Sequence, residues 1–156
     1  MSAAESASAR LAALGLKLPE VATPVAAYVP AVRTGDYVYT SGQLPIVEGK
    51  LQGTGKVGDS VTIEQAAGFA RIAALNALAA AAAAAGGLDA IKRVVKVVCF
   101  VSSATDFTGQ AQVANGASEL LMDVLGDAGK HARSAVGMAV LPLDTPVEVE
   151  IVVEVA

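Results

Sequence analysis

The sequence predicts a single α+β domain in which helices cover one face of a β-sheet, with the elements in the order ββαβαββ. Runs rich in β-branched and aromatic residues predict the strands, and two longer runs between them predict the helices. The length of 156 residues and the apolar content of 54% suit one domain that buries a full core without a disulfide or a structural metal. No solenoid-like repeat and no interdomain linker interrupts this order.

The first 24 residues are expected to form an extension ahead of the domain, which spans residues 25–156. The alanine-rich stretch Ala3–Leu14 favours a short amphipathic helix, and Gly15 favours its end because glycine readily adopts a left-handed backbone. Pro19 and Pro24 then keep the chain extended. Because this N-terminus has no basic start followed by an apolar segment and a cleavage site, we expect a cytoplasmic protein.

The domain is expected to begin with a β-hairpin. Its strands, residues 28–33 and 37–43, are rich in β-branched and aromatic residues, and Thr34-Gly35-Asp36 between them has the composition of a turn. Residues 48–58 then hold four glycines in a polar setting, which predicts a loop or a small ribbon. The hexapeptide at 53–58 matches a dinucleotide-binding pattern in letters alone, because it neither follows a strand nor opens a helix.

A long helix is expected to follow this loop. Thr62 and Gln65 have the spacing of a capping box, the helical run continues to Ala85, and Gly86-Gly87 ends it. Its small alanine side chains let such a helix lie close to a sheet. The longest apolar run within it, Ala77–Ala85, is too short to span a bilayer, so no membrane association is expected.

A third strand, a second helix and a final hairpin complete the predicted order. Residues 91–103 form a strand of valine, cysteine and phenylalanine, in which Cys99 is expected to pack as an inert apolar thiol. Asp106 is expected to cap a helix that runs to about Leu125. The segment Gly126–Lys130 then leads into the two C-terminal strands, which are expected to pair with each other.

The composition argues against nucleic-acid and metal chemistry. The chain carries 15 acidic and 11 basic residues without a basic cluster, and only 4% aromatic residues, so it is poorly suited to neutralise phosphates or stack bases. Its single histidine, His131, is expected in a turn and excludes a multi-histidine metal site, and with one cysteine a zinc site would need several carboxylates. A mean hydropathy of +0.55 indicates apolar surface that other subunits cover, so we expect an oligomer.

Arg133 and the glutamates of the last strand are the main candidates for chemistry. Arg133 opens an apolar run, and the following run carries Glu148, Glu150 and Glu154 on one side of its alternation. A guanidinium offers a fork of donors that matches a carboxylate, and a glutamate on a nearby strand can hold or activate a water. Pairing of the two strands as a hairpin would place Arg133 opposite Glu154, where the two could form a surface ion pair. The same register separates Arg133 from Glu148 by roughly 20 Å, so a ligand site would need two subunits.

The motifs at both ends of the domain resemble those of the RidA/YjgF family, also known as L-PSP endoribonucleases or translation inhibitors. The resemblance rests on Tyr39-Thr40-Ser41-Gly42-Gln43-Leu44-Pro45, on Ala132-Arg133-Ser134 and on the strand Val147-Glu148-Val149-Glu150, and it spans about residues 26–155. It implies a chorismate-mutase-like fold with a mixed sheet, and a homotrimer with clefts between subunits. The implied activity is hydrolysis of reactive enamines and imines to keto acids and ammonia, without a metal or an organic cofactor.

The resemblance also implies roles for individual residues. Arg133 would bind the carboxylate of the substrate, and Glu148 would position the water that attacks the imine carbon. The residues that would border the cleft are Ser41, Gly42, Tyr28 and Asn115. The chain departs from the family at Ala135, where many members have a cysteine, and at His131, where a proline is usual.

Two other functions remain open at this point. A noncatalytic protein that binds small keto acids would keep Arg133 and show no turnover. The family name also suggests an endoribonuclease, but the excess of acidic residues disfavours RNA binding.

Overall fold

The computed structural model describes residues 5–21, 23 and 27–156. The expectations for Ala3 and Pro24, and the proposed boundary between residues 24 and 25, lie outside these described residues. In chain order the helices and strands are α1 (Ala7–Ala13), β1 (Ala31–Thr34), β2 (Tyr37–Thr40), β3 (Ile46–Val47), β4 (Lys50–Leu51), α2 (Ile63–Ala85), β5 (Ile91–Ser102), α3 (Gln110–Leu125), β6 (Ala132–Met138) and β7 (Val147–Val155). Short 3₁₀ turns are η1 (Leu88–Ala90), η2 (Gly126–Gly129) and η3 (Pro142–Asp144).

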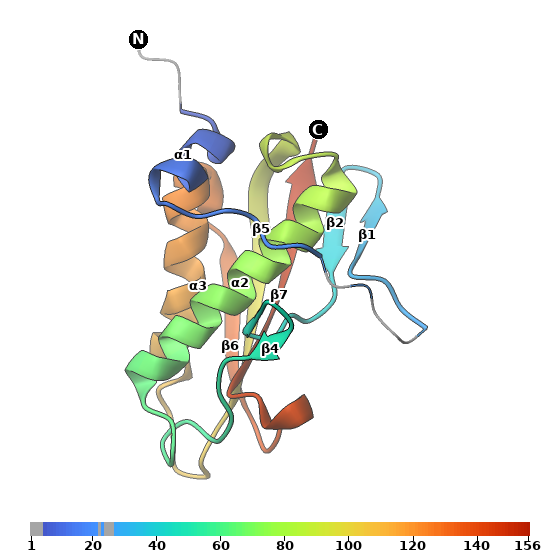
Figure 1. Cartoon of the computed structure of the whole chain (residues 1–156). Helices are drawn as coiled ribbons and strands as arrows, with labels where there is room; N and C mark the ends of the chain where they lie inside the picture. Colours follow the sequence, from blue (N-terminus) through green and yellow to red (C-terminus); the bar gives the residue numbers. More distant parts are fainter. Residues whose placement is uncertain (1–4, 22, 24–26) are drawn as a thin grey trace.

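The main sheet is mixed, and helices α2 and α3 lie on the same side of it (Figure 1). Its strand order is β1-β2-β7-β5-β6, in which only β5 and β6 run parallel. Along β7, residues alternate regularly between buried and half-buried positions, as a strand does when helices cover one face. The predicted α+β class, with helices on one face of the sheet, is therefore confirmed.

The two C-terminal strands do not pair with each other, so the predicted final hairpin is wrong. Strand β5 lies between them, parallel to β6 and antiparallel to β7. With twelve residues that are mostly apolar on both faces, β5 has the composition of a central strand. As a result, Arg133 lies beside Val97 of β5, rather than opposite Glu154.

Helix α2 begins and ends as the sequence predicts. The Thr62 hydroxyl accepts from the Gln65 amide, and the Gln65 side chain accepts from the Thr62 amide, which completes the capping box. Gly86 ends the helix in the left-handed conformation, with φ of 91°. The whole helix is long and apolar enough to cross a membrane, but 56% of its most apolar window is buried inside the protein. It packs across the sheet as a core helix.

Helix α3 begins later than predicted, and Asp106 does not cap it. Gly109 precedes the helix and makes no side-chain capping bond. Thr105 and Asp106 form a turn instead, which is closed by a hydrogen bond from the Phe107 amide to the Ala104 carbonyl at 3.0 Å. Residues 107–109 follow this turn without helical structure, so the helix begins at Gln110.

The N-terminal segment packs onto the domain. Helix α1 lies beside one end of α3 (Figure 1), and the Ser8 amide donates to the Asp89 carboxylate in η1 at 2.9 Å. Gly15 follows the helix with a left-handed φ of 71°, as predicted. The described part of the extension is therefore attached to the helical layer.

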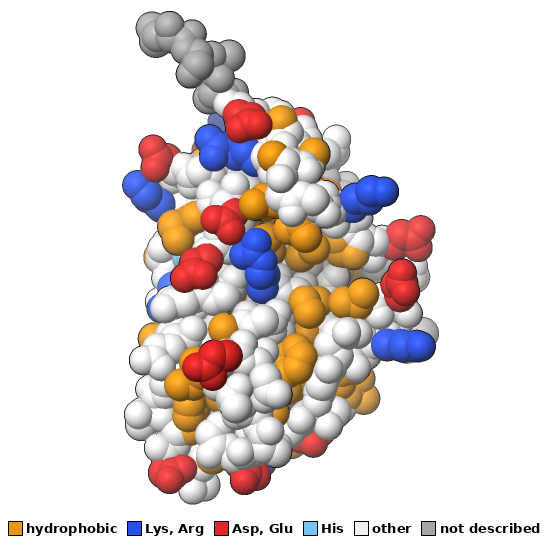
Figure 2. All heavy atoms as spheres, turned by 60° about the vertical axis from the view of Figure 1, so that its left-hand side comes forward, with side chains coloured by type: hydrophobic (Ala, Val, Ile, Leu, Met, Phe, Trp, Pro, Cys, Tyr) orange, Lys and Arg blue, Asp and Glu red, His pale blue; other side chains and the backbone are white. Residues whose placement is uncertain are grey.

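The sheet face opposite the helices carries several exposed apolar side chains, and none of the described helices covers it. Its large exposed side chains are Val32, Tyr37, Tyr39, Val136 and Met138. On the side of the molecule seen in Figure 2, Lys and Arg side chains are spaced among Asp and Glu, without a single basic patch. The uncovered sheet face supports the expectation that other subunits cover apolar surface.

Candidate active site

The structure gathers the predicted site residues into two clusters. The arginine cluster lies where edge strand β6 faces α3, and it consists of Arg133, Asn115, Ser118 and His131. The glutamate cluster lies where the chain leaves β2 beside β7, and it consists of Glu148 and Gly42 with the adjacent Ser41. Tyr28 is linked to it only through the chain, because Ser41 bonds the neighbouring residue Val29.

Neutral oxygens from α3 hold the guanidinium of Arg133. Its Nη1 donates to Asn115 Oδ1 at 2.8 Å and to Ser118 Oγ at 3.1 Å. Among the described residues, Arg133 takes part in no ion pair, and its Nε and Nη2 make no hydrogen bond. These two nitrogens form one edge of the guanidinium fork, whose geometry matches the two oxygens of a carboxylate. The cluster can therefore bind a small anion without first breaking an ion pair.

The alternative of an ion pair between Arg133 and Glu154 is wrong. Glu154 lies 3.8 Å from Lys92, and in the sheet it is aligned with Arg93 of β5 and Tyr37 of β2. The intervening strand β5 separates it from β6, so the arginine is not used in this pair.

The carboxylate of Glu148 lies against the backbone of Gly42. A Cβ atom at position 42 would overlap this carboxylate, so a larger residue there would displace the Glu148 side chain from its position. Burial raises the pKa of the Glu148 carboxyl above its ordinary value, and the negative charge of Glu150 raises it further. A carboxylate with a raised pKa is a stronger proton acceptor, which is the property that a general base requires.

Ser41 fixes the loop at the edge of the glutamate cluster. Its hydroxyl donates to the Val29 carbonyl at 2.6 Å, and its amide donates to the Pro30 carbonyl at 2.8 Å. These bonds hold the chain next to Tyr28, whose side chain is 59% exposed. The hydroxyl hydrogen of Ser41 is thus used within the chain, while the phenol of Tyr28 is accessible to a ligand or a neighbouring subunit.

One chain does not bring the two clusters together. Arg133 is aligned with Val97 of β5, and Glu148 with Phe100. Three residues along a strand and two spacings between strands put their Cα atoms roughly 14 Å apart. Val97 is buried under the helices, whereas Phe100 faces the opposite side, so Arg133 and Glu148 also lie on opposite faces of the sheet.

Ser118 and His131 are site residues that the sequence did not indicate. His131 was expected only as a turn residue, but its ring lies between the Ser118 hydroxyl at 2.9 Å and the Gly129 carbonyl at 2.6 Å. The one available signal was the spacing of Asn115 and Ser118, which puts both on the same face of a helix.

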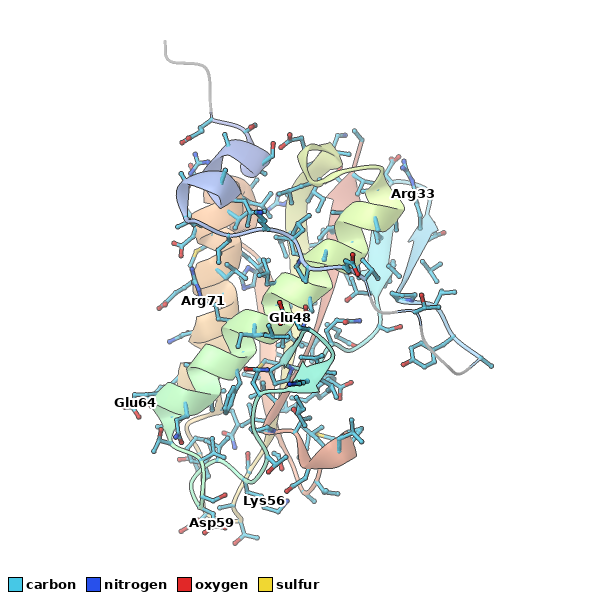
Figure 3. All side chains as sticks on the ribbon, viewed as in Figure 1. Arg33, Glu48, Lys56, Asp59, Glu64 and Arg71 are labelled. Carbon is cyan, nitrogen blue, oxygen red and sulfur yellow. The ribbon has the colours of Figure 1, made fainter. Side chains whose placement is uncertain are left out.

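Cys99 and Lys56 have structural roles outside both clusters. Cys99 is fully buried beside Ala135, and burial raises the pKa of its thiol to about 12, in agreement with the predicted inert role. Lys56 lies in the loop before α2, at the lower end of the molecule in Figure 3. Its ammonium donates to Ser102 Oγ at 3.4 Å and to the Ala139 carbonyl. Lys56, which belongs to the hexapeptide at 53–58, therefore links the loop before α2 to the ends of β5 and β6.

A cavity outside the two clusters is lined by none of their residues. It has a volume of about 930 Å³ and lies between α2, the β3–β4 ribbon and residues 17–21. Its lining is mainly apolar, and the amide of Asn76 already donates to the carbonyls of Leu44 and Ile46, at 2.9 Å each. Across the described part of the chain, no three His, Cys, Asp or Glu side chains are grouped as metal ligands. We therefore place the candidate site at the two clusters, where charged groups are arranged for chemistry.

Comparison with known proteins gives consistent matches over nearly the whole chain. Residues 8–155 match the family model described as "YjgF/chorismate mutase-like, putative endoribonuclease". A curated relative, Protein TCP17 of Trypanosoma cruzi, is 44% identical over 148 residues, which cover 94% of this chain and 92% of the relative.

Two solved structures are informative for fold and ligand. The crystal structure of a "putative endoribonuclease" from Shewanella oneidensis is 33% identical, with a TM-score of 0.92 over 97% of this chain and 100% of that one. The Escherichia coli protein TdcF, solved with bound serine, is 25% identical, with a TM-score of 0.63 over 87% of this chain and 94% of that one.

Proposed function

The chain belongs to the YjgF/chorismate mutase-like family, and from this premise we propose that it hydrolyses small imines and enamines that carry a carboxylate. The observation that carries the proposal is the guanidinium of Arg133, which is held by neutral oxygens and keeps its Nε and Nη2 edge for an anion. The serine bound to Escherichia coli TdcF is a small molecule with a carboxylate, and it supports a ligand of this class.

We further propose that the site forms between subunits of a homotrimer. The arginine and glutamate clusters lie on opposite faces of the sheet, so a ligand of a few atoms cannot bridge them on one chain. The exposed apolar side chains on the sheet face opposite the helices, among them Tyr37, Tyr39 and Val136, supply surface for such an assembly. In a closed ring, the arginine cluster of each subunit would meet the glutamate cluster of the next.

The proposed reaction needs only a carboxylate anchor and a base. An enamine first gains a proton at carbon and loses one from nitrogen, which converts it to the imine. Glu148 takes a proton from water as the water oxygen adds to the imine carbon, and the imine nitrogen gains a proton. The resulting carbinolamine then loses ammonia, which leaves the keto acid, while Arg133 holds the carboxylate throughout. Gly42 keeps the space in which the Glu148 carboxylate lies.

Arg133→Ala is expected to raise KM for a carboxylate-bearing imine about 100-fold, because it removes two charge-assisted hydrogen bonds to the substrate. Arg133→Lys should restore only part of this loss, since an ammonium cannot match both oxygens at once. The imine is generated in place by oxidation of an amino acid, and keto acid formation is measured above the spontaneous rate. An unchanged KM in folded Arg133→Ala would contradict the proposed anchor.

The rate of hydrolysis is expected to fall with decreasing pH at values above the ordinary titration range of glutamate. The raised pKa of Glu148 means that its carboxylate becomes protonated, and inactive as a base, at a higher pH than usual. Glu150→Gln removes one of the two causes, so activity should persist to lower pH than in the wild type. A pH profile of kcat/KM for both proteins tests this. If kcat/KM falls at the same acidic pH in the wild type and in Glu150→Gln, Glu148 does not control this fall.

The alternative function is binding of small keto acids or amino acids without turnover, which the serine complex of TdcF also favours. A binding protein would bind pyruvate in calorimetry but would release keto acid from the imine no faster than the spontaneous rate. Hydrolysis of RNA is disfavoured by the net charge of −4 and by the spacing of basic side chains among acidic ones.

A further inference from the structure

A row of three hydrogen bonds runs from Arg133 into the protein. Nη1 of Arg133 donates to the Ser118 hydroxyl at 3.1 Å, this hydroxyl lies 2.9 Å from His131 Nε2, and His131 Nδ1 lies 2.6 Å from the Gly129 carbonyl oxygen. Ser118 is buried, so water competes little for these bonds. The row links the candidate anchor to two residues that do not reach the ligand edge of the guanidinium.

Each bond in the row has a single direction when the imidazole is neutral. A carbonyl oxygen only accepts, so the bond to Gly129 requires a hydrogen on His131 Nδ1, which leaves a lone pair on Nε2. A guanidinium only donates, so the Ser118 oxygen accepts from Arg133 and sends its own hydrogen to Nε2. The network therefore assigns the Nδ1–H tautomer to His131.

Close packing fixes the far end of this row. Gly129 ends η2 against α3, where a Cβ atom would overlap the carbonyl oxygen of Leu121. Asn115 accepts from Nη1 as well, so both hydrogens of that nitrogen are bound. An arginine on an edge strand otherwise samples many rotamers. These contacts select one orientation of the guanidinium and leave the Nε and Nη2 edge for a carboxylate.

We propose that Ser118 and His131 are positioning residues that hold Arg133 ready for two-point binding of a carboxylate. This inference rests on the proposed function of Arg133 as the anchor. Because the guanidinium is ordered when the protein folds, the ligand does not have to order it on binding. Loss of either residue therefore weakens carboxylate binding more than it slows the chemical step.

Ser118→Ala and His131→Phe are expected to raise the Kd of pyruvate and KM for the imine about tenfold, while kcat stays within about twofold of the wild type. His131→Gln keeps an acceptor close to the position of Nε2 and should recover most of the affinity. Glu119→Ala is the matched control, because Glu119 is exposed and follows Ser118 on α3. Calorimetry gives Kd, steady-state kinetics gives KM and kcat, and urea unfolding shows that each variant is folded.

Nitrogen-15 NMR tests these hydrogen bonds directly, because it shows which ring nitrogen of His131, the only histidine in the chain, carries the hydrogen. The wild-type imidazole should carry hydrogen on Nδ1 and a lone pair on Nε2. Saturation with pyruvate should shift the Nε2 resonance through Arg133 and Ser118, and this shift should be absent in Arg133→Ala. A hydrogen on Nε2 of the neutral ring would overturn the proposed row without any reference to activity.

The results separate the two proposals. If Arg133→Ala loses pyruvate binding while folded Ser118→Ala and His131→Phe keep wild-type Kd and KM, the positioning role is overturned and the anchor remains. If Arg133→Ala also keeps the wild-type Kd, the proposed function fails. If Ser118→Ala does not fold, the affinities of His131→Phe and His131→Gln decide.

Discussion

Glu148→Gln is expected to lower kcat for imine hydrolysis by about 10²–10⁴-fold, because glutamine cannot accept the proton of the attacking water. The amide is close in size to the carboxylate and meets the same backbone at Gly42, so folding should be retained. The Kd of pyruvate should stay near the wild-type value, because the carboxylate anchor lies in the other cluster. Keto acid formation and calorimetry on the same preparation measure both effects. Full activity in this variant would remove the general base from the proposed mechanism.

Mixing Glu148→Gln with Arg133→Ala should then restore activity that neither variant has alone. In a ring of randomly mixed subunits, about one quarter of the interfaces join an intact arginine cluster to an intact glutamate cluster. Co-refolding the two variants in equal amounts should therefore recover about a quarter of the wild-type kcat/KM, which is measured at low substrate concentration. The control mixes each variant with itself. No recovery from mixed oligomers would mean that both clusters of one chain serve the same site, or that the clusters do not act together.

Local signals in the sequence predicted the boundaries that depend on nearby residues. The Thr62–Gln65 capping box and the left-handed Gly86 are formed by groups within a few positions of each other, so their spacing alone indicates them. The predicted start of α3 was wrong because the turn before Phe107 is stabilised by packing. Phe107 lies against Gly58, which is far away in the sequence: a Cβ atom on Gly58 would lie 2.9 Å from the Phe107 side chain. Such tertiary contacts leave no periodic signal at Asp106.

Strand pairing also could not be predicted from local sequence signals. The two C-terminal runs are adjacent in the sequence and each alternates suitably, so a hairpin between them satisfied every local criterion. Only the position of β5 between them decides the sheet order, and this depends on burial of both β5 faces in the whole fold. The inference that one chain cannot supply both clusters nevertheless holds, with β5 and the opposite faces of the sheet as the reason instead of distance along a hairpin.

The residues of the candidate site were also predicted only in part. Arg133, Asn115, Glu148 and Gly42 were predicted from motifs, and the structure brings Arg133 to Asn115 and Glu148 to Gly42. Ser118 and His131 could not be predicted, because their contacts require α3 to lie against the start of β6. A lone histidine before a strand has no pattern that distinguishes a turn residue from a hydrogen-bond partner.

Gly116→Ala is expected to destabilise the protein by about 3 kcal/mol, because α3 crosses α2 so closely that a Cβ atom at position 116 would overlap the backbone carbonyl of Ala67. The backbone cannot move aside as a side chain can, so the helices must separate. Gly68→Ala is the matched control on α2: nothing lies within 4 Å of its Cβ position, and alanine should stabilise the helix by about 0.5–1 kcal/mol.

Urea unfolding at one fixed protomer concentration measures both changes, because the stability of an oligomer depends on concentration. Opposite signs for the two substitutions are the expected result. Since Asn115 and Ser118 flank Gly116 on α3, any separation of the helices should also displace the oxygens that hold Arg133. The Kd of pyruvate should therefore rise in folded Gly116→Ala and stay unchanged in Gly68→Ala. Equal stability of the two variants would show that α2 and α3 are not packed as closely as their backbones indicate.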